Sequence, residues 1–318
     1  MTPAQLRAFA AVARLGSVKA AAAELGVSEA AVSLHVGHLR KELGDQLFSR
    51  TGSGLAFTPG GLRLAGRAPQ LLGLQELTVR EVRQAGGGRR LLRLGASSLF
   101  AEYAAPGLIE AFTRRANDLE VELRTIRGSQ LESDLVTRSL DAVIAPQIHL
   151  RSSDLTSTHF LNYEVICVAA PAHPATQTPP SLTRMREFAW LLGLSVTEPG
   201  GIVSEMVRRI GVPEERQQIF QSHAAALEEA KRGRGVCLTV GFAVGSDLEE
   251  GTLARVEAPI LRGRGEWSIA TLDKNRAPSA ATELVRFVAN PRATQAMLRR
   301  RGAGLGRFRP SVHVTLWS

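Results

Sequence analysis

The chain has 318 residues, of which 44% are hydrophobic and 22% charged, a balance typical of globular proteins. Its length predicts two or three domains. The longest apolar runs, such as 165–170, are far too short to cross a bilayer, and the N-terminus lacks the layout of a signal peptide. We therefore expect a cytoplasmic protein with no membrane contact. Its two cysteines cannot form a disulfide framework and fit a reducing compartment.

The net charge of +9 is concentrated at the two ends of the chain. Residues 1–93 hold 13 arginines and lysines against 6 acidic residues, and residues 299–318 hold 5 arginines and no acid. The stretch 94–298 is mildly acidic. A basic terminal module indicates a polyanionic partner, commonly nucleic acid. A solvated surface in an arginine-rich proteome would give the same composition, so charge alone leaves both interpretations open.

The first sixty residues predict three short helices and a wing. Residues 3–15 form an amphipathic helix, Ser17 and Ser28 are placed as N-caps of the next two helices, and Gly26 provides the turn between them. This is the pattern of a helix-turn-helix. Residues 47–58 then predict two short strands joined by a Gly-rich turn.

The third helix exposes small and hydrogen-bonding side chains, as a helix entering the major groove requires. The wing would carry Arg50 toward the backbone or the minor groove. Both serines have a structural role as caps besides any contact with phosphate. We expect DNA contacts from Ser17, Ser28, Glu29, Ala30, Ser33, Leu34, His38, Arg50 and Thr51.

This segment resembles the LysR-type transcriptional regulators. The resemblance is carried at fixed spacings by Gln5-Leu6-Arg7, Gly16-Ser17, Ala20-Ala21, Ala31-Val32-Ser33, Leu47-Phe48 and Thr58-x-x-Gly61. Two positions depart from the family pattern, since Glu29 replaces the usual Gln and Arg40 the usual Glu. Glu29 can accept from a cytosine amino group but repels phosphate, so the family's base preference does not carry over.

A long amphipathic helix is expected over residues 58–85, and glycines at 86–88 end it. Such a helix cannot bury its apolar stripe alone, and pairing with the same helix of a second copy would do so. It resembles the family's dimerisation helix, and the resemblance implies dimers of dimers. Because an interior proline removes a hydrogen bond, Pro69 predicts a bend or break near residues 66–69.

The rest of the chain alternates strands and helices, which predicts α/β sheets. Strands are expected at 91–95, 119–126, 142–145, 165–170, 190–195, 219–221, 235–240 and 267–272, and helices at 99–115, 130–138, 202–210, 224–232 and 280–289. The resemblance implies two hinged lobes like those of periplasmic binding proteins, with crossings near 163 and 267. The expected divisions are an all-α winged helix-turn-helix at 1–58, a linker helix at 59–88, an effector domain at 89–300 (lobe I at 89–163 and 267–300, lobe II at 164–266) and a basic tail at 301–318.

Ligands of such folds sit at the carboxyl ends of strands and at helix N-termini. There the free N–H groups and hydroxyls could hold a small metabolite, an anionic one included; the alternative is that the same residues simply cap helices. The candidates are Ser97, Ser98, Gly128, Ser129, Thr197, Gly200, Gly201, Ser222, His223 and Thr239.

No enzyme motif is recognisable, so we expect no catalytic residues, cofactor or metal. The sequence predicts a transcriptional regulator that binds promoter DNA, responds to a small-molecule effector and, if it activates, contacts RNA polymerase. The alternatives are a thiol-based redox regulator and a small-molecule receptor without DNA specificity. Cys167 and Cys237 lie in apolar strand patterns, which favours buried, inert thiols. The tail could be an arm on DNA, a strand on a neighbour, or disordered.

Overall fold

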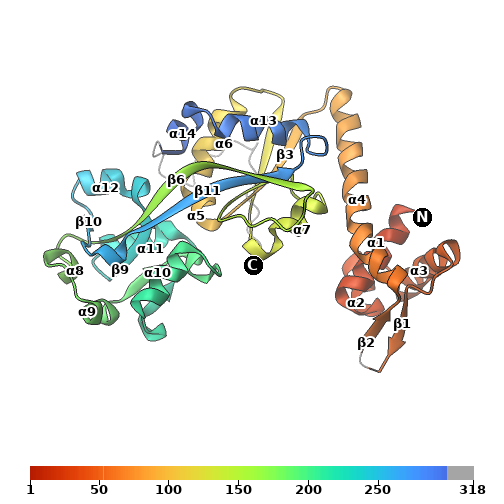
Figure 1. The fold of residues 1–318 in the computed structure, drawn as a ribbon, viewed down its shortest axis with the longest axis horizontal. Coiled ribbons are helices and arrows are strands. Elements are labelled where there is room, and N and C mark those ends of the chain that lie inside the picture. Colours follow the sequence, from red (N-terminus) through yellow and green to blue (C-terminus); the bar gives the residue numbers. More distant parts are fainter. Residues whose placement is uncertain (53, 299–318) are drawn as a thin grey trace. The chain divides into compact units, whose positions relative to one another are not determined.

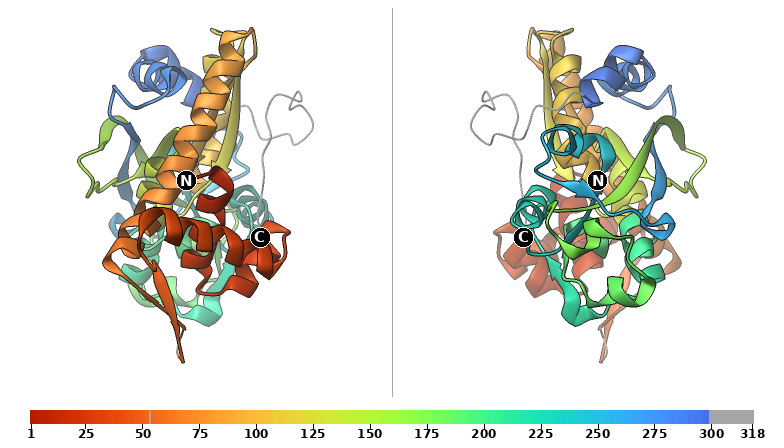
Figure 2. Two further views of the ribbon diagram at one scale, coloured as in Figure 1. Left: turned by 90° about the vertical axis from the view of Figure 1, so that its right-hand side faces the viewer. Right: turned by 90° about the vertical axis from the view of Figure 1, so that its left-hand side faces the viewer.

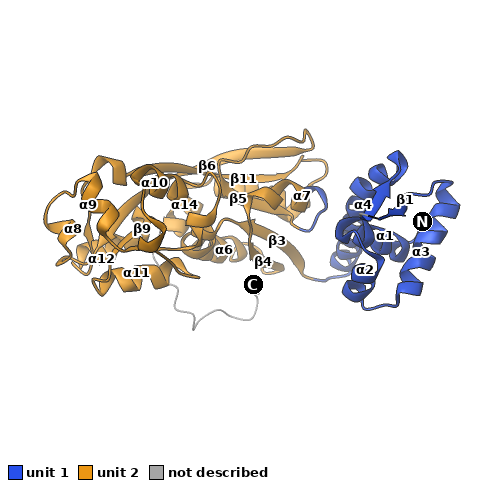
Figure 3. Ribbon diagram, turned by 90° about the horizontal axis from the view of Figure 1, so that it is seen from below, with its two compact units in different colours: residues 1–88, 136–139 blue, residues 89–135, 140–318 orange. Residues whose placement is uncertain are grey.

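A computed structural model describes residues 1–52 and 54–298. The predicted tail, 301–318, lies outside the described residues. The chain divides into two units, residues 1–88 with 136–139 and residues 89–135 with 140–318 (Figure 3). No helix among the described residues is both long enough and apolar enough to cross a membrane.

The first unit begins with three helices, and the predicted serines cap the second and the third. The helices are α1 (Pro3–Leu15), α2 (Val18–Leu25) and α3 (Glu29–Leu43). Ser17 accepts a hydrogen bond from the Ala20 N–H at 3.3 Å, and Ser28 accepts one from the Ala31 N–H at 3.1 Å. Gly26 has a φ of +65° in the turn between α2 and α3. The helix-turn-helix prediction is confirmed.

The wing consists of β1 (Phe48–Thr51) and β2 (Gly54–Phe57), which pair antiparallel. Asp45 ties its base to the following helix by accepting from the Leu47 N–H at 2.6 Å and the Thr58 hydroxyl at 2.7 Å. These two hydrogen bonds, that of Thr58 first, lower the pKa of Asp45. A Cβ at Gly61 would lie 1.8 Å from the Leu47 carbonyl oxygen, so only glycine fits this close approach.

The predicted linker helix is α4 (Pro59–Ala85), and it is continuous (Figures 1 and 2). Of the bend or break expected near 66–69, the break is wrong, because the loss of one backbone hydrogen bond at Pro69 does not end a helix of 27 residues. Near its start, Leu64 and Ala68 are buried in the core of the first unit. Farther along, Leu74 and Val82 are 47% and 67% exposed.

The second unit is built on a sheet whose strands follow the order β4-β3-β5-β11-β6-β9-β7-β8, with β10 paired to β6. The strands are β3 (Arg90–Ala96), β4 (Leu119–Thr125), β5 (Ala142–Pro146), β6 (Leu155–Ala169), β7 (Trp190–Leu192), β8 (Gln217–Ile219), β9 (Val236–Val240), β10 (Ala254–Arg255) and β11 (Gly263–Leu272). The long strands β6 and β11 run antiparallel through the unit (Figure 1). They join a first lobe around β3, β4 and β5 to a second lobe around β7, β8 and β9.

Helices cover the two lobes separately. The α-helices are α5 (Ser98–Tyr103), α6 (Ala105–Thr113), α7 (Leu131–Val136), α8 (Pro174–Gln177), α9 (Leu182–Glu187), α10 (Ile202–Ile210), α11 (His223–Lys231), α12 (Gly245–Glu249), α13 (Ser279–Val288) and α14 (Pro291–Leu298). Short 3-10 turns are η1 (Gly128–Gln130), η2 (Leu194–Thr197), η3 (Glu214–Arg216), η4 (Gly241–Val244) and η5 (Pro259–Leu261). The two-lobed α/β architecture agrees with the prediction.

Several boundaries differ from the sequence prediction for physical reasons. The helix expected at 99–115 is interrupted at Ala104, because Pro106 has no N–H and is seated in the first turn of a new helix, α6. Strand β6 starts at Leu155, ten residues before the expected strand. Its first half carries exposed polar side chains, so the apolar pattern used for the prediction did not include it. The strand expected at 190–195 ends at Leu192 and continues as the 3-10 turn η2.

Candidate functional site

One face of the first unit combines the start of α2, the start of α3 and the wing. A groove of about 270 Å³ lies between them. It brings together four of the predicted DNA contacts, which are Ser17, Glu29, Arg50 and Thr51. It also includes Lys19, which the sequence analysis did not single out although a lysine in the first turn of α2 was a recognisable signal. The result is a groove bordered by two cations and one carboxylate.

The remaining predicted contacts, which all belong to α3 or its cap, are solvent-exposed. They are Ser28, Ala30, Ser33, Leu34 and His38. Val32 and Val36, at 0% and 3% exposed, hold the opposite side of α3 in the core. A rigid helix with one buried and one polar, accessible face is the form that major-groove recognition requires. The contacts themselves stay predictions.

Arg40, where the sequence departs from the family pattern, fastens the wing to α3. Its Nη2 donates to the Phe48 carbonyl oxygen at 2.6 Å, and its guanidinium lies 4.8 Å from the centroid of the Phe48 ring. A cation over an aromatic face combined with a hydrogen bond to the same residue restrains the first strand of the wing. Arg50, two residues farther along β1, remains exposed.

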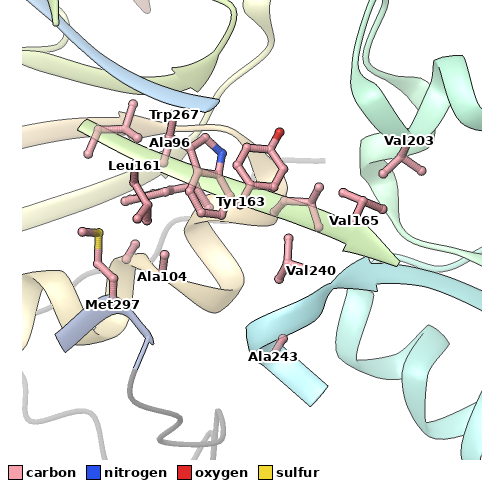
Figure 4. Packing of buried hydrophobic residues seen from close by; sticks show 14 of the residues in the cluster. Ala96, Ala104, Leu161, Tyr163, Val165, Val203, Val240, Ala243, Trp267 and Met297 are labelled. Carbon is pink, nitrogen blue, oxygen red and sulfur yellow. The ribbon is translucent and has the colours of Figure 1, made fainter. Parts of the chain in front are cut away.

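In the second unit, a small cavity lies where the two lobes meet. It is lined by Ser97, Leu99, Pro146, Tyr163, Ser195, Glu198, Gly201, Ile202, Val203 and Trp267. The Tyr163 and Trp267 rings stack with their centroids 4.1 Å apart, on the two strands that join the lobes (Figure 4). A Cβ at Gly265, which pairs with Tyr163, would lie 2.4 Å from that ring. The cavity volume is about 10 Å³, enough for about one water molecule.

Two carboxylates cross the boundary between the lobes, and each bonds to the helix N-terminus of the other lobe. Glu198, which follows η2, accepts from the Ser98 hydroxyl at 2.7 Å and the Ser98 N–H at 3.3 Å at the start of α5. Glu102 of α5 accepts from the Ser222 hydroxyl and from the N–H groups of His223 and Ala224, at 2.9, 2.8 and 2.6 Å. Hydrogen bonds at the N-termini of α5 and α11 therefore hold the two lobes together.

His223 completes this connection. Its Nε2 lies 3.3 Å from the Ser98 hydroxyl, and the side chain is buried. Burial lowers the pKa of His223, while the negative charge of Glu102 opposes that shift. Burial therefore favours the neutral form of the imidazole. A Cβ at Gly193 would lie 2.0 Å from its Nδ1, so glycine is required where β7 ends.

The structure distributes the predicted effector contacts unevenly. Ser97 and Gly201 line the cavity, while Ser98, Ser222 and His223 take part in the bonds between the lobes. Thr239 is buried in β9 and does not line the cavity. Four others are exposed and outside the cavity lining, namely Gly128, Ser129, Thr197 and Gly200. Their roles stay predictions.

Sequence reasoning missed five residues that shape this region. They are Glu102, Tyr163, Ser195, Glu198 and Trp267. Glu198 had a usable signal, since it directly precedes the Pro-Gly-Gly turn that opens α10. The aromatic pair carried none, because each ring reads as an ordinary apolar strand position.

Both cysteines are buried in neighbouring strands, at 1% and 2% exposure. Cys167 is paired with Leu238, and Cys237 with Val168. Since adjacent residues of a strand point to opposite faces of the sheet, the two thiols lie on opposite faces and cannot form a disulfide without backbone rearrangement. Burial raises the pKa of Cys167, and it raises the pKa of Cys237 to about 12. Peroxide-sensing thiols are exposed and acidic, so these thiols do not favour the redox alternative.

The Cys167→Ala/Cys237→Ala double variant should therefore bind DNA with the affinity of the wild type before and after peroxide treatment. Native wild-type protein should react with Ellman's reagent only as fast as it unfolds, because neither thiolate is accessible. The two measurements are an anisotropy titration and the kinetics of thiol labelling. A thiol that reacts within seconds in the folded protein, together with peroxide-sensitive DNA binding that the variant loses, would restore the redox interpretation.

Family models match both units of the chain. The family model described as a bacterial regulatory helix-turn-helix protein of the lysR family matches residues 3–62, and the model described as the LysR substrate binding domain matches residues 85–291. An uncharacterised HTH-type transcriptional regulator of Mycobacterium tuberculosis strain H37Rv is 52% identical over 321 aligned residues, and the alignment covers 100% of both chains. The RuBisCO operon transcriptional regulator of Allochromatium vinosum is 27% identical and covers 89% of this chain and 94% of its own.

Solved structures show the same fold. A full-length OxyR variant from Pseudomonas aeruginosa has a TM-score of 0.58 at 23% identity and covers 91% of this chain and 94% of its own. Full-length CbnR in complex with its target DNA has a TM-score of 0.56 at 18% identity, with 91% and 99% covered.

Proposed function

Because this chain belongs to the LysR-type transcriptional regulators, and is thus a DNA-binding regulator with an effector-binding domain, we propose which of its residues do this work. The first unit, whose head spans 1–58, reads an operator with the exposed face of α3 and with the wing. Ser33 and Leu34 face the bases, Arg50 and Lys19 approach the DNA backbone or the minor groove, and Glu29 selects a base. The two cations on the rim of the groove supply the salt-sensitive part of the affinity.

We further propose that the effector binds between the lobes of the second unit, in the cavity that Ser97, Ser195, Tyr163 and Trp267 line. One observation carries this proposal, namely four buried polar atoms on those residues that have no hydrogen-bond partner. Buried polar groups are nearly always paired, and several orphans around one cavity indicate a missing ligand. Binding would shift the population between two lobe arrangements, and α4 would pass that change to the DNA-reading heads.

The chain acts as an oligomer in this proposal. Two copies pair through α4, and two such dimers form a tetramer that holds the heads at the spacing of operator half-sites. Where the protein activates transcription, one of its surfaces contacts RNA polymerase. The exposed apolar side chains of Leu71, Leu74 and Val82 support pairing through α4.

The operator can be tested by fluorescence anisotropy with purified protein, the DNA upstream of its own coding sequence, and unrelated DNA of equal length. We expect salt-sensitive binding with about a 1000-fold or greater preference for the upstream fragment. Ser33→Ala and Arg50→Ala should each weaken specific binding. Equal, weak affinity for both DNAs at every salt concentration, unchanged by these substitutions, would contradict the proposed reading face.

A further inference from the structure

Glu198 is a carboxylate that lies largely away from solvent without a positive partner. Its hydrogen bonds both end on Ser98, and among residues 1–52 and 54–298 it forms no ion pair. Burial raises the pKa of Glu198, and the two hydrogen bonds from Ser98 only partly oppose that shift. Charged groups inside proteins are normally paired, so a cation in the cavity would be the matching partner of the ionised Glu198 carboxylate.

Four polar atoms without partners surround the same cavity. They are the Ser97 Oγ, the Ser195 Oγ, the Tyr163 hydroxyl and the Trp267 Nε1, and their residues are 4%, 3%, 5% and 0% exposed. The indole N–H can only donate, and the three hydroxyls can donate as well. All four groups can therefore donate to a hydrogen-bond acceptor in the cavity, and the indole N–H requires one.

Two helix N-termini at the boundary between the lobes are already occupied, whereas that of α10, which has no side-chain cap, lies at the cavity with Gly201 and Ile202. Glu198 holds the Ser98 N–H at the start of α5, and Glu102 holds the first N–H groups of α11. No arginine or lysine lines the cavity. A simple anion would meet the Glu198 carboxylate and no arginine or lysine, although the sequence had allowed for an anionic metabolite.

We propose that the cleft binds a small ligand that carries a protonated amine beside a hydrogen-bond acceptor, as in an amino acid or its amide. The ammonium group pairs with Glu198, while the acceptor oxygen receives hydrogen bonds from Trp267 and from the hydroxyls of Ser97 and Ser195. Glu198 is then the residue that sets the charge class of the ligand. This inference rests on the proposed effector cleft. Because the cavity holds about one water molecule, the lobes must part to admit the ligand.

The test is isothermal titration calorimetry of the full-length protein against a matched panel. The probes are the twenty amino acids, their amides, and the α-hydroxy acids with the same side chains, in which a hydroxyl replaces the amine. We expect at least one amine-bearing probe to bind. Its α-hydroxy counterpart should bind with an affinity at least about tenfold lower.

Three variants interpret the result. Glu198→Gln keeps an acceptor for Ser98 and removes only the charge, so it should abolish the preference for the amine. Glu205→Gln, an exposed glutamate of the neighbouring helix α10, should behave as the wild type. Trp267→Phe keeps a ring against Tyr163 and removes the N–H, so it should weaken every probe regardless of charge.

Each outcome decides something different. If the hydroxy acids bind the wild type best, or no amine-bearing probe binds, the charge assignment is overturned and the effector cleft is not. If probes bind but neither Glu198→Gln nor Trp267→Phe changes their affinity, the ligand lies elsewhere, and both the assignment and the proposed cleft are overturned.

Discussion

Replacing Leu74 and Val82 of α4 by glutamate should convert the protein to monomers and weaken its operator affinity by about 100-fold or more. Leu71, Leu74 and Val82 are 42%, 47% and 67% exposed, and their spacing places them on one side of the helix. A second copy of α4 would cover this strip. Once one head of a dimer is bound, the second head meets its half-site at a high effective concentration. A carboxylate in the strip would prevent the dimer from forming, and the gain in affinity would be lost with it.

Leu62→Glu provides a matched control. Leu62 is 61% exposed on the same helix, but at about 3.6 residues per turn it lies roughly 120° and 200° around the axis from Leu74 and Val82. It should therefore leave the oligomeric state unchanged. Light scattering coupled to size-exclusion chromatography measures the mass, and anisotropy with one and two half-sites measures the avidity. A Leu74→Glu/Val82→Glu variant that remains dimeric would show that α4 is not the pairing surface.

The head could be predicted from sequence because its determinants are local. Ser17 and Ser28 each accept a hydrogen bond from the N–H three residues ahead, and Gly26 supplies a positive φ at a turn, so each signal lies beside the structure it controls. The effect of a proline on a helix could not be predicted from the local sequence. Pro69 sits inside an unbroken helix, whereas Pro106 stands at the start of a new one. The residue type alone does not decide the outcome: Pro69 costs a long helix one backbone hydrogen bond, whereas Pro106 occupies a first turn, where its missing N–H needs no partner.

The cleft could be predicted only in outline. Glu102 and Glu198 are 96 positions apart, and each meets a helix N-terminus of the opposite lobe. No periodicity or spacing in the sequence predicts such a pair, because its contacts depend on how the two lobes pack against each other. Sequence reasoning located the helix N-termini correctly and took their N–H groups to be free. The structure shows those at the starts of α5 and α11 bonded to the protein's own carboxylates, so these N–H groups are not available to an anionic ligand.

Glu29→Gln should change the base preferred at one operator position from cytosine to adenine, with a discrimination of about 1–3 kcal/mol. Glu29 is exposed in the first turn of α3 and lines the groove together with Arg50 and Lys19. A carboxylate only accepts, which matches the cytosine amino group, whereas an amide both donates and accepts, which matches adenine. Removing the negative charge also removes repulsion from phosphate, so affinity for unrelated DNA should rise.

The measurement is anisotropy with operators that carry each of the four base pairs at successive positions. Glu24→Gln is the control, because Glu24 is an exposed glutamate of the preceding helix that pairs with Arg14 and does not line the groove. It changes the net charge equally and should raise non-specific affinity without altering base preference. The two effects of Glu29 are thereby separated, since only a side chain that touches a base edge can move the preference from one base pair to another. If both variants kept the base preference of the wild type, Glu29 would act through charge alone.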